Sequence, residues 1–189
     1  TINAGNGSEL TGTSEPGSEI KVDVDGDGIP DYTTTADNDG NWSITLDTPL
    51  TDGTEVTATA TDKAGNVSDP VSDNVDGTAP VVSIDDVLTQ DTTPPLSGTI
   101  DNTTAAIVVT VNGIDYPATN NGDGTWTLDD NTLPALTDGT YTITVTATDA
   151  ANNSSTDTAE LIIDTTAPNA PTINAGNGSE LTGTSEPGS

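Results

Sequence analysis

Four aspartates alternate with other residues in one short segment of the chain. Asp23, Asp25, Asp27 and Asp31 occupy positions 1, 3, 5 and 9 of the sequence DVDGDGIPD, with a glycine at position 6. Carboxylate oxygens are hard ligands, and Ca²⁺ takes about six to eight of them in a flexible geometry, whereas Mg²⁺ requires a smaller octahedral cage. The spacing therefore predicts a Ca²⁺-binding loop.

The same segment resembles known calcium loops only in part. Its spacing matches the first part of an EF-hand loop and resembles the calcium loops of thrombospondin type 3 and dockerin repeats. However, Thr34 stands at position 12, where an EF-hand has its bidentate glutamate, and no helical pattern flanks the loop. The alternative is a glycine-rich hairpin turn, which is the form of residues 111–116 (VNGIDY) farther along the chain.

The composition excludes several classes of function. The chain has 189 residues with 31 Asp and Glu, 2 Lys and Arg, and no His or Cys, so its formal net charge is −29. Two cationic side chains cannot form a basic surface that binds nucleic acid or an anionic membrane. Ser/His/Asp or Cys/His catalysis and His/Cys zinc sites need residues that are missing. Carboxylate chemistry remains, and cations between the carboxylates would offset their mutual repulsion.

The chain consists of repeats. Residues 1–18 (TINAGNGSELTGTSEPGS) recur unchanged as residues 172–189. A diverged period of about 86 residues relates LTGT at Leu10 to LSGT at Leu96, and LTDGT at Leu50 to LTDGT at Leu136. These periods predict two domains, residues 1–78 and 79–166, and a linker with the start of a truncated third repeat at 167–189. Because no signal-like segment precedes Thr1, we expect an internal piece of a longer protein.

Short alternating segments separated by turn residues every 8 to 12 positions predict an all-β sandwich of about seven strands in each repeat. Trp42 and Trp126 occupy matching places and are predicted to anchor the two cores between their sheets. In the first repeat we expect an edge strand near Thr1 and strands at 9–13, 19–24, 32–36, 41–46, 55–60 and 71–73. In the second repeat we expect strands at 96–99, 107–111, 116–119, 125–128, 141–148 and 159–163.

These motifs together resemble the tandem bacterial immunoglobulin-like domains that form the extender region of giant RTX-type and biofilm-associated surface adhesins. The resemblance rests on SEPGS (14–18), DNDGNW (37–42), LTDGT (50–54), TATDKAGN (59–66) and DGTAP (76–80). It implies all-β immunoglobulin-like sandwiches in a linear, monomeric rod on the bacterial cell surface. It also implies that calcium ions stiffen the junctions between neighbouring repeats.

A second set of carboxylates is predicted from this topology. In an immunoglobulin-type sandwich, the loops after the second and sixth strands share one pole with the incoming chain. This places linker Asp76 near Asp101 and Asp149, and we expect Ca²⁺ among these three side chains. Ordinary turns capped by Asp and Asn are the alternative. The corresponding groups at the other junctions are Asp164 with Glu186, and Glu15 with Asp62.

Two functions of different classes follow. The first is a structural spacer of a calcium-dependent surface adhesin, which projects a distal ligand-binding region and has neither enzymatic activity nor a membrane-inserted segment. The alternative is a module that binds glycan or ice through rows of threonine such as Thr142, Thr144, Thr146 and Thr148. Paired carboxylates also serve in glycosidases, but 2 Trp and 3 Tyr are too few to form sugar pockets, so no enzyme is predicted.

Overall fold

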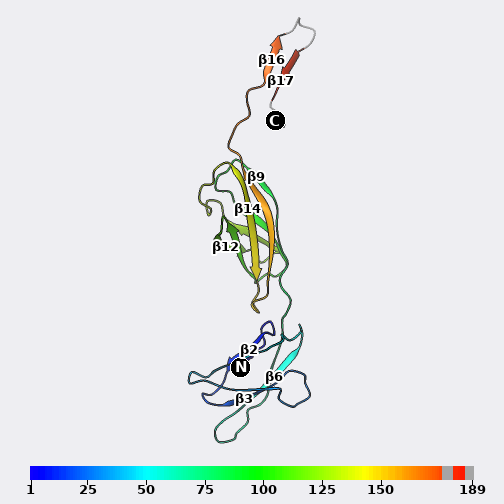
Figure 1. Ribbon diagram of the computed structural model, residues 1–189, viewed down its shortest axis with the longest axis vertical. Coiled ribbons are helices and arrows are strands. Elements are labelled where there is room, and N and C mark those ends of the chain that lie inside the picture. The colour runs from blue at the N-terminus through cyan, green and yellow to red at the C-terminus, as the bar shows by residue number, and fades with distance from the viewer. Residues whose placement is uncertain (176–180, 186–189) are drawn as a thin grey trace.

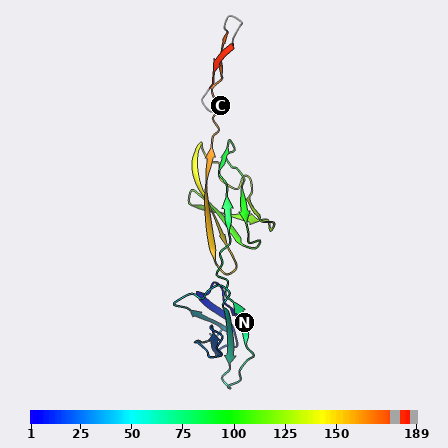
Figure 2. The same cartoon turned by 90° about the vertical axis from the view of Figure 1, so that its right-hand side faces the viewer.

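The computed structural model describes residues 1–175 and 181–185, and the regular structure in this part of the chain is entirely β-strand. No helix among these residues is long and apolar enough to cross a membrane. Figures 1 and 2 show two β-sandwiches and a hairpin that follow one another along the longest axis. The predicted all-β, immunoglobulin-like fold class is confirmed.

The first sandwich has two sheets around one core. Strands of one sheet lie in the order β1-β2-β5, and those of the other in the order β4-β3-β6-β7. Leu10, Val22 and Val56 are fully buried between the sheets, and Trp42 is 5% exposed. The strands are β1 (Ile2–Asn3), β2 (Glu9–Thr13), β3 (Glu19–Asp23), β4 (Tyr32–Thr35), β5 (Asn41–Thr45), β6 (Glu55–Thr61) and β7 (Val71–Asn74).

The second sandwich is larger, and its strands are connected in the order β8-β10-β13-β12-β11-β14-β15-β9. Strand β12 pairs with β11 and with β13, so it joins the two layers around a separate core. The strands are β8 (Val82–Ile84), β9 (Val87–Thr89), β10 (Leu96–Ile100), β11 (Ala106–Val111), β12 (Ile114–Asn120), β13 (Thr125–Leu128), β14 (Gly139–Thr148) and β15 (Ser154–Ile163).

Alternation of side chains accounts for most of these strands. Along β14, Ile143, Val145 and Ala147 are completely buried while the intervening threonines are not, as a strand with one core face requires. The predicted strands differ from the observed ones by a few residues, except that β15 begins at Ser154 rather than Ala159. Its polar first half pairs with β14 over its full length, so long-range pairing forms a strand where composition favoured a loop. Strands β8 and β9 were not predicted.

Each tryptophan packs against a glycine on the neighbouring strand. Trp126 lies opposite Gly98 in the β10–β13 ladder and donates its indole N–H to the carbonyl of Ser83 at 3.0 Å. A Cβ on Gly98 would lie 1.9 Å from that oxygen, and a Cβ on Gly12 would lie 2.2 Å from the carbonyl oxygen of Thr1 beside Trp42. The predicted role of both tryptophans as core anchors is confirmed, because Trp126 is fully buried in the second core and Trp42 is only 5% exposed in the first.

The described part of the third repeat is a hairpin. Strands β16 (Thr172–Ala175) and β17 (Leu181–Thr184) pair with Ile173 opposite Gly183. This is the register of β1 and β2, where Ile2 lies opposite Gly12. The identical 18-residue sequence therefore forms the same strand pair at both places.

Candidate metal sites and the junction between the sandwiches

The acidic segment forms the loop between β3 and β4. Gly26 and Gly28 adopt φ values of 74° and 82°, a conformation that glycine enters without a steric penalty. The two oxygens of Asp23 accept the N–H groups of Gly26 at 2.7 Å and Gly28 at 2.8 Å. These hydrogen bonds, foremost that from Gly26, lower the pKa of Asp23 and so favour its charged form.

Three of the four predicted loop ligands come together. Asp23, Asp25 and Asp27 each place a carboxylate oxygen within 4.8 Å of the others, and theirs is the only such group in the described chain. Asp31 is not part of this group, and its Oδ2 accepts the N–H of Val24 at 2.9 Å. Hard oxygens on an exposed loop suit Ca²⁺ with water completing its coordination. The same carboxylates also cap loop amides, as the alternative of an ordinary turn requires.

The linker after the first sandwich is held by a carboxylate that the sequence analysis did not single out. Asp52 accepts the N–H of Gly77 at 2.9 Å and the hydroxyl of Thr78 at 3.1 Å. Asp138, its counterpart in the second sandwich, accepts the N–H of Thr165 at 3.0 Å and its hydroxyl at 2.6 Å. Both aspartates belong to the repeated LTDGT motif, so the repetition was the signal that could have identified them.

The second sandwich holds the other end of the first linker. The side-chain amide of Asn153 donates to the carbonyl of Asp76 at 2.6 Å and to Oδ2 of Asp149 at 3.0 Å. Oδ1 of Asp101 accepts the N–H of Val81 at 2.7 Å, and the hydroxyl of Ser155 donates to the carbonyl of Pro80. Hydrogen bonds from both sandwiches therefore fix the linker.

The predicted junction carboxylates lie in this same region. Asp76 and Asp101 line a hollow of about 300 Å³, and Asn153 connects the backbone of Asp76 to Asp149. Asp149 is only 8% exposed and also accepts the N–H of Asn153 at 2.8 Å, so it stabilises its own turn. In the residues that the structure describes, these three carboxylates do not converge within 4.8 Å as those of the β3–β4 loop do.

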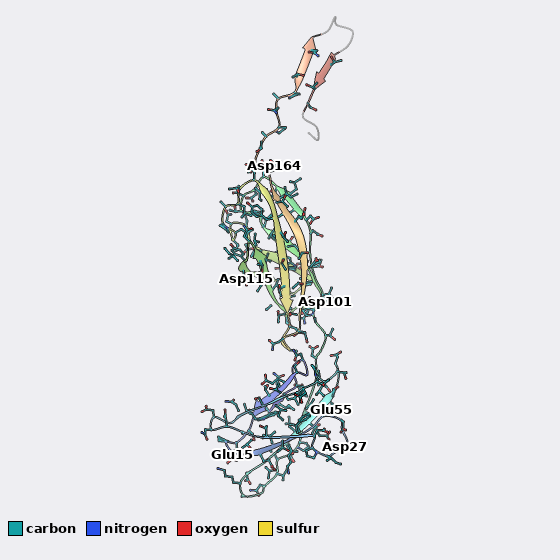
Figure 3. All side chains as sticks on the ribbon, viewed as in Figure 1. Glu15, Asp27, Glu55, Asp101, Asp115 and Asp164 are labelled. Atoms are coloured by element: carbon teal, nitrogen blue, oxygen red, sulfur yellow. The ribbon has the colours of Figure 1, made fainter. Side chains whose placement is uncertain are left out.

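Figure 3 places Asp101 at the end of the second sandwich that faces the first, and Asp164 at the opposite end. Glu186 lies outside the described residues, so its predicted place beside Asp164 has no structural counterpart here. Glu15 and Asp62 line one hollow of about 290 Å³ on the first sandwich. Asp62 accepts both the N–H of Asn66 at 2.8 Å and its side-chain amide at 2.7 Å, the arrangement of Asp149 and Asn153.

The carboxylate of Asp138, which holds the second linker, is expected to make the second sandwich sensitive to acid. Hydrogen bonds from the hydroxyl and N–H of Thr165 and the hydroxyl of Thr166 lower the pKa of Asp138. A lowered folded-state pKa contributes stability above the unfolded value of about 4 and loses it as the pH falls through the folded value. We expect Asp138→Ala to reduce the loss of stability below about pH 4 in urea titrations monitored by Trp126 fluorescence.

Asp129→Ala is the matched control, because the Asp129 side chain is exposed and, within the described part of the chain, only its backbone carbonyl accepts a hydrogen bond. It should leave the fall in the free energy of unfolding below about pH 4 unchanged. An equal fall in the Asp138→Ala variant and in the unmodified chain would contradict the proposed role of the linker hydrogen bonds.

The threonines of β14 form a regular pattern with their neighbours. Thr144 lies opposite Thr110 of β11 and opposite Thr158 of β15. Thr142 is exposed, and Thr144, Thr146 and Thr148 are half-buried. The hydroxyls thus stand in register across three strands, while the alternate residues of β14 enter the core.

The sequence matches two family models. Residues 70–165, just over half of the chain, match the model described as "Bacterial Ig-like domain", and residues 1–76 match the model described as "Bacterial Ig domain". A comparison with curated protein sequences finds no match.

Several solved structures are similar at low sequence identity. A Ca²⁺-stabilised adhesin that helps an Antarctic bacterium bind ice is 23% identical, with 86% of this chain and 45% of that chain covered and a TM-score of 0.34. Fibronectin(III)-like modules of CbhA from Clostridium thermocellum are 15% identical, with coverage of 86% and 93% and a TM-score of 0.46. The BSP domain of a biofilm-associated protein is 20% identical, with coverage of 85% and 28% and a TM-score of 0.34.

This chain spans less than half of the length of that ice-binding adhesin structure. Family membership therefore rests on the sequence models, which together extend from residue 1 to residue 165. The match to residues 1–76 contains the first sandwich, and the match to residues 70–165 contains the second. The chain belongs to the bacterial Ig-like domain family.

Proposed function

We propose that this chain is a spacer segment of a bacterial cell-surface adhesin, in which Ca²⁺ stiffens the sandwiches and the junctions between them. The observation that carries the proposal is that the linker at Asp76–Pro80 is hydrogen-bonded from both sides. Its Gly77 N–H donates to Asp52 of the first sandwich, and Asn153 and Ser155 of the second sandwich donate to its carbonyls. Such two-sided contacts restrict how far one sandwich swings against the next. A spacer needs this property, and an isolated binding module does not.

The charge supports a role for cations. A net charge of −29 on 189 residues opposes compaction unless counterions lie among the carboxylates. Asp23, Asp25 and Asp27 would hold one ion in the β3–β4 loop, and Asp76 with Asp101 would contribute to another at the junction. Ca²⁺ would supply only electrostatic and geometric constraint, because the residues around both places are oxygen donors without catalytic partners.

A bacterial surface location agrees with the family and with the similar structures, which include a Ca²⁺-stabilised adhesin and a biofilm-associated protein. We assign no enzymatic activity to this chain. The neighbouring repeats of the same chain and calcium ions are its proposed partners, and the chain would act as a monomer.

Small-angle X-ray scattering tests the spacer function. With Ca²⁺ we expect an extended particle with a narrow distribution of angles between the sandwiches, and with EDTA a broader distribution. Asp76→Ala removes a carboxylate that lines the junction hollow and should broaden the distribution in Ca²⁺. Asp39→Ala, an exposed loop variant with the same change of charge, should not. Identical profiles with Ca²⁺ and EDTA would contradict the proposal.

A second candidate function is binding of glycan or ice by the threonine face. The register of Thr110, Thr144 and Thr158 across adjacent strands favours it, because a repeated array of hydroxyls can match a repeated ligand. Outward threonines are equally expected from strand propensity alone. Retention of the chain on a glycan array or in growing ice, lost in Thr144→Val, would support this second function.

A further inference from the structure

The first sandwich contains a groove between its two sheets. Its volume is about 300 Å³, and it opens beside the strand pair β1–β2 on one side and β6–β7 on the other. The indole of Trp42 and the side chain of Ile20 form part of its apolar wall. Thr13, Ser14, Ala60 and Ser68 also line the groove.

The second sandwich identifies what belongs in this groove. Ile2 pairs with Gly12 and Ile84 pairs with Gly98, so Thr1 corresponds to Ser83. The residue before Ser83 is Val82, which pairs with Ile100, is 8% exposed and belongs to the second core.

Burial of matching alanines agrees with this correspondence. Ala147 is fully buried in the second sandwich, whereas Ala60, at the same place in the TATD motif, is only half-buried beside the groove. The position equivalent to Val82 is therefore where an apolar side chain would complete the first core.

Two polar anchors of the second linker are also present in the first sandwich. Ser155 donates its hydroxyl to the carbonyl of Pro80. Its counterpart Ser68 lines the groove, where its hydroxyl donates to the carbonyl of Asp69 at 2.9 Å. Asn153 donates to the carbonyl of Asp76, and its counterpart Asn66 is held in the same way by Asp62. Within the described residues, the Asn66 amide makes its hydrogen bond to Asp62, which leaves its second proton for a linker carbonyl.

We propose that this groove is the docking site for the linker that precedes a repeat, and that its occupant has the sequence of residues 164–171 (DTTAPNAP). That segment stands directly before residues 172–189, which are identical to residues 1–18. Pro171 then occupies, in the first core, the place that Val82 has in the second. Carbonyls of the segment accept hydrogen bonds from Asn66 and from Ser68, whose hydroxyl turns away from the Asp69 carbonyl.

A proline fits this position in the ladder. The nitrogen of Thr1 donates to the carbonyl of Thr13 at 2.7 Å. Because donors in an antiparallel pair alternate along the strand, the preceding residue directs its nitrogen away from β2. A proline there loses no ladder hydrogen bond, and its ring supplies apolar surface for the groove.

The test joins residues 164–171 to Thr1 of the full chain and measures thermal unfolding in excess EDTA, so that the result does not depend on Ca²⁺. An eight-residue Gly-Ser segment at the same place is the matched control. We expect the midpoint of the first sandwich to rise by about 4–8 °C with DTTAPNAP and to remain unchanged with Gly-Ser. The indole N–H resonance of Trp42, assigned with Trp42→Phe, should shift only in the DTTAPNAP fusion.

Ser68→Ala should remove part of the gain in the fusion while changing the unfused chain less. Equal midpoints and equal Trp42 resonances in the two fusions would overturn the proposal. A concentration-dependent dimer of the unfused chain, with the Trp42 shift appearing on association, would also overturn it, since the groove would then take the segment from a second copy.

Discussion

Millimolar Ca²⁺ is expected to raise the thermal unfolding midpoint of the chain by about 10–20 °C over excess EDTA. An ion that binds only the folded state, at a free concentration of about 100 times its Kd, adds about 2.7 kcal/mol to the free energy of unfolding. Each kcal/mol shifts the midpoint of a domain of this size by about 4–8 °C. Circular dichroism at matched ionic strength measures the effect. Mg²⁺ should give a much smaller shift, since exposed loop carboxylates do not enclose the tight octahedral cage that it requires.

The β3–β4 loop provides the variant that locates one of the ions. Asp27→Ala removes one of the three clustered carboxylates and should lower the number of bound Ca²⁺ ions by one and reduce the shift of the first sandwich only. Asp39→Ala changes the net charge equally on an exposed turn and should alter neither quantity. An unaltered ion count in Asp27→Ala would show that the loop is a turn capped by its own aspartates, and identical midpoints in Ca²⁺ and EDTA would remove calcium from the proposed function.

Gly98→Ala is expected to destabilise the second sandwich by about 2–4 kcal/mol, the sum of overpacking and a lost hydrogen bond. The added Cβ would lie 1.9 Å from the carbonyl oxygen of Ser83 and 2.7 Å from Nε1 of Trp126. Both contacts are too short, so β8 must separate from β10 and the indole must give up its bond to Ser83. Urea unfolding followed by Trp126 fluorescence in a Trp42→Phe background measures the change.

Ser97→Ala is the control for this prediction, because Ser97 is exposed on the same strand and should change the free energy of unfolding by less than about 0.5 kcal/mol. Gly12→Ala tests the matching site, where the Cβ would lie 2.2 Å from the Thr1 carbonyl oxygen and 2.5 Å from the Trp42 ring. A Gly98→Ala variant as stable as the Ser97→Ala variant would mean that the strand pair adapts, and that the glycine in the LTGT and LSGT motifs is not required for packing.

The sequence by itself determined most of the strands. Alternation of apolar and polar residues marks strands such as β14 whether or not their partners are known, because successive side chains of a strand point to opposite faces. The repeats at 86 and 171 residues related the two sandwiches and placed both tryptophans in corresponding cores. The clustering of Asp23, Asp25 and Asp27 could also be predicted, since the approach of carboxylates two residues apart in one loop depends on local backbone geometry only.

The partners of these local elements were decided by the tertiary structure. Strands β8 and β9 are three residues each, too short for a periodic signal, and exist because β10 and β15 offer them an edge. Asp31 has the spacing of a ligand, yet its Oδ2 accepts the N–H of Val24 and it lies outside the group of three carboxylates.

The junction and the groove depend on the tertiary structure most. Asp52 and Gly77 are 25 residues apart, and Asn153 and Asp76 are 77 residues apart, so no local pattern in the sequence relates them. Ala60 and Ala147 occupy the same motif, yet only one is fully buried, because Val82 covers one core and nothing in the described chain covers the other. Sequence periodicity specifies which residues face inward, whereas the folded arrangement of distant segments specifies which side chains each inward face contacts.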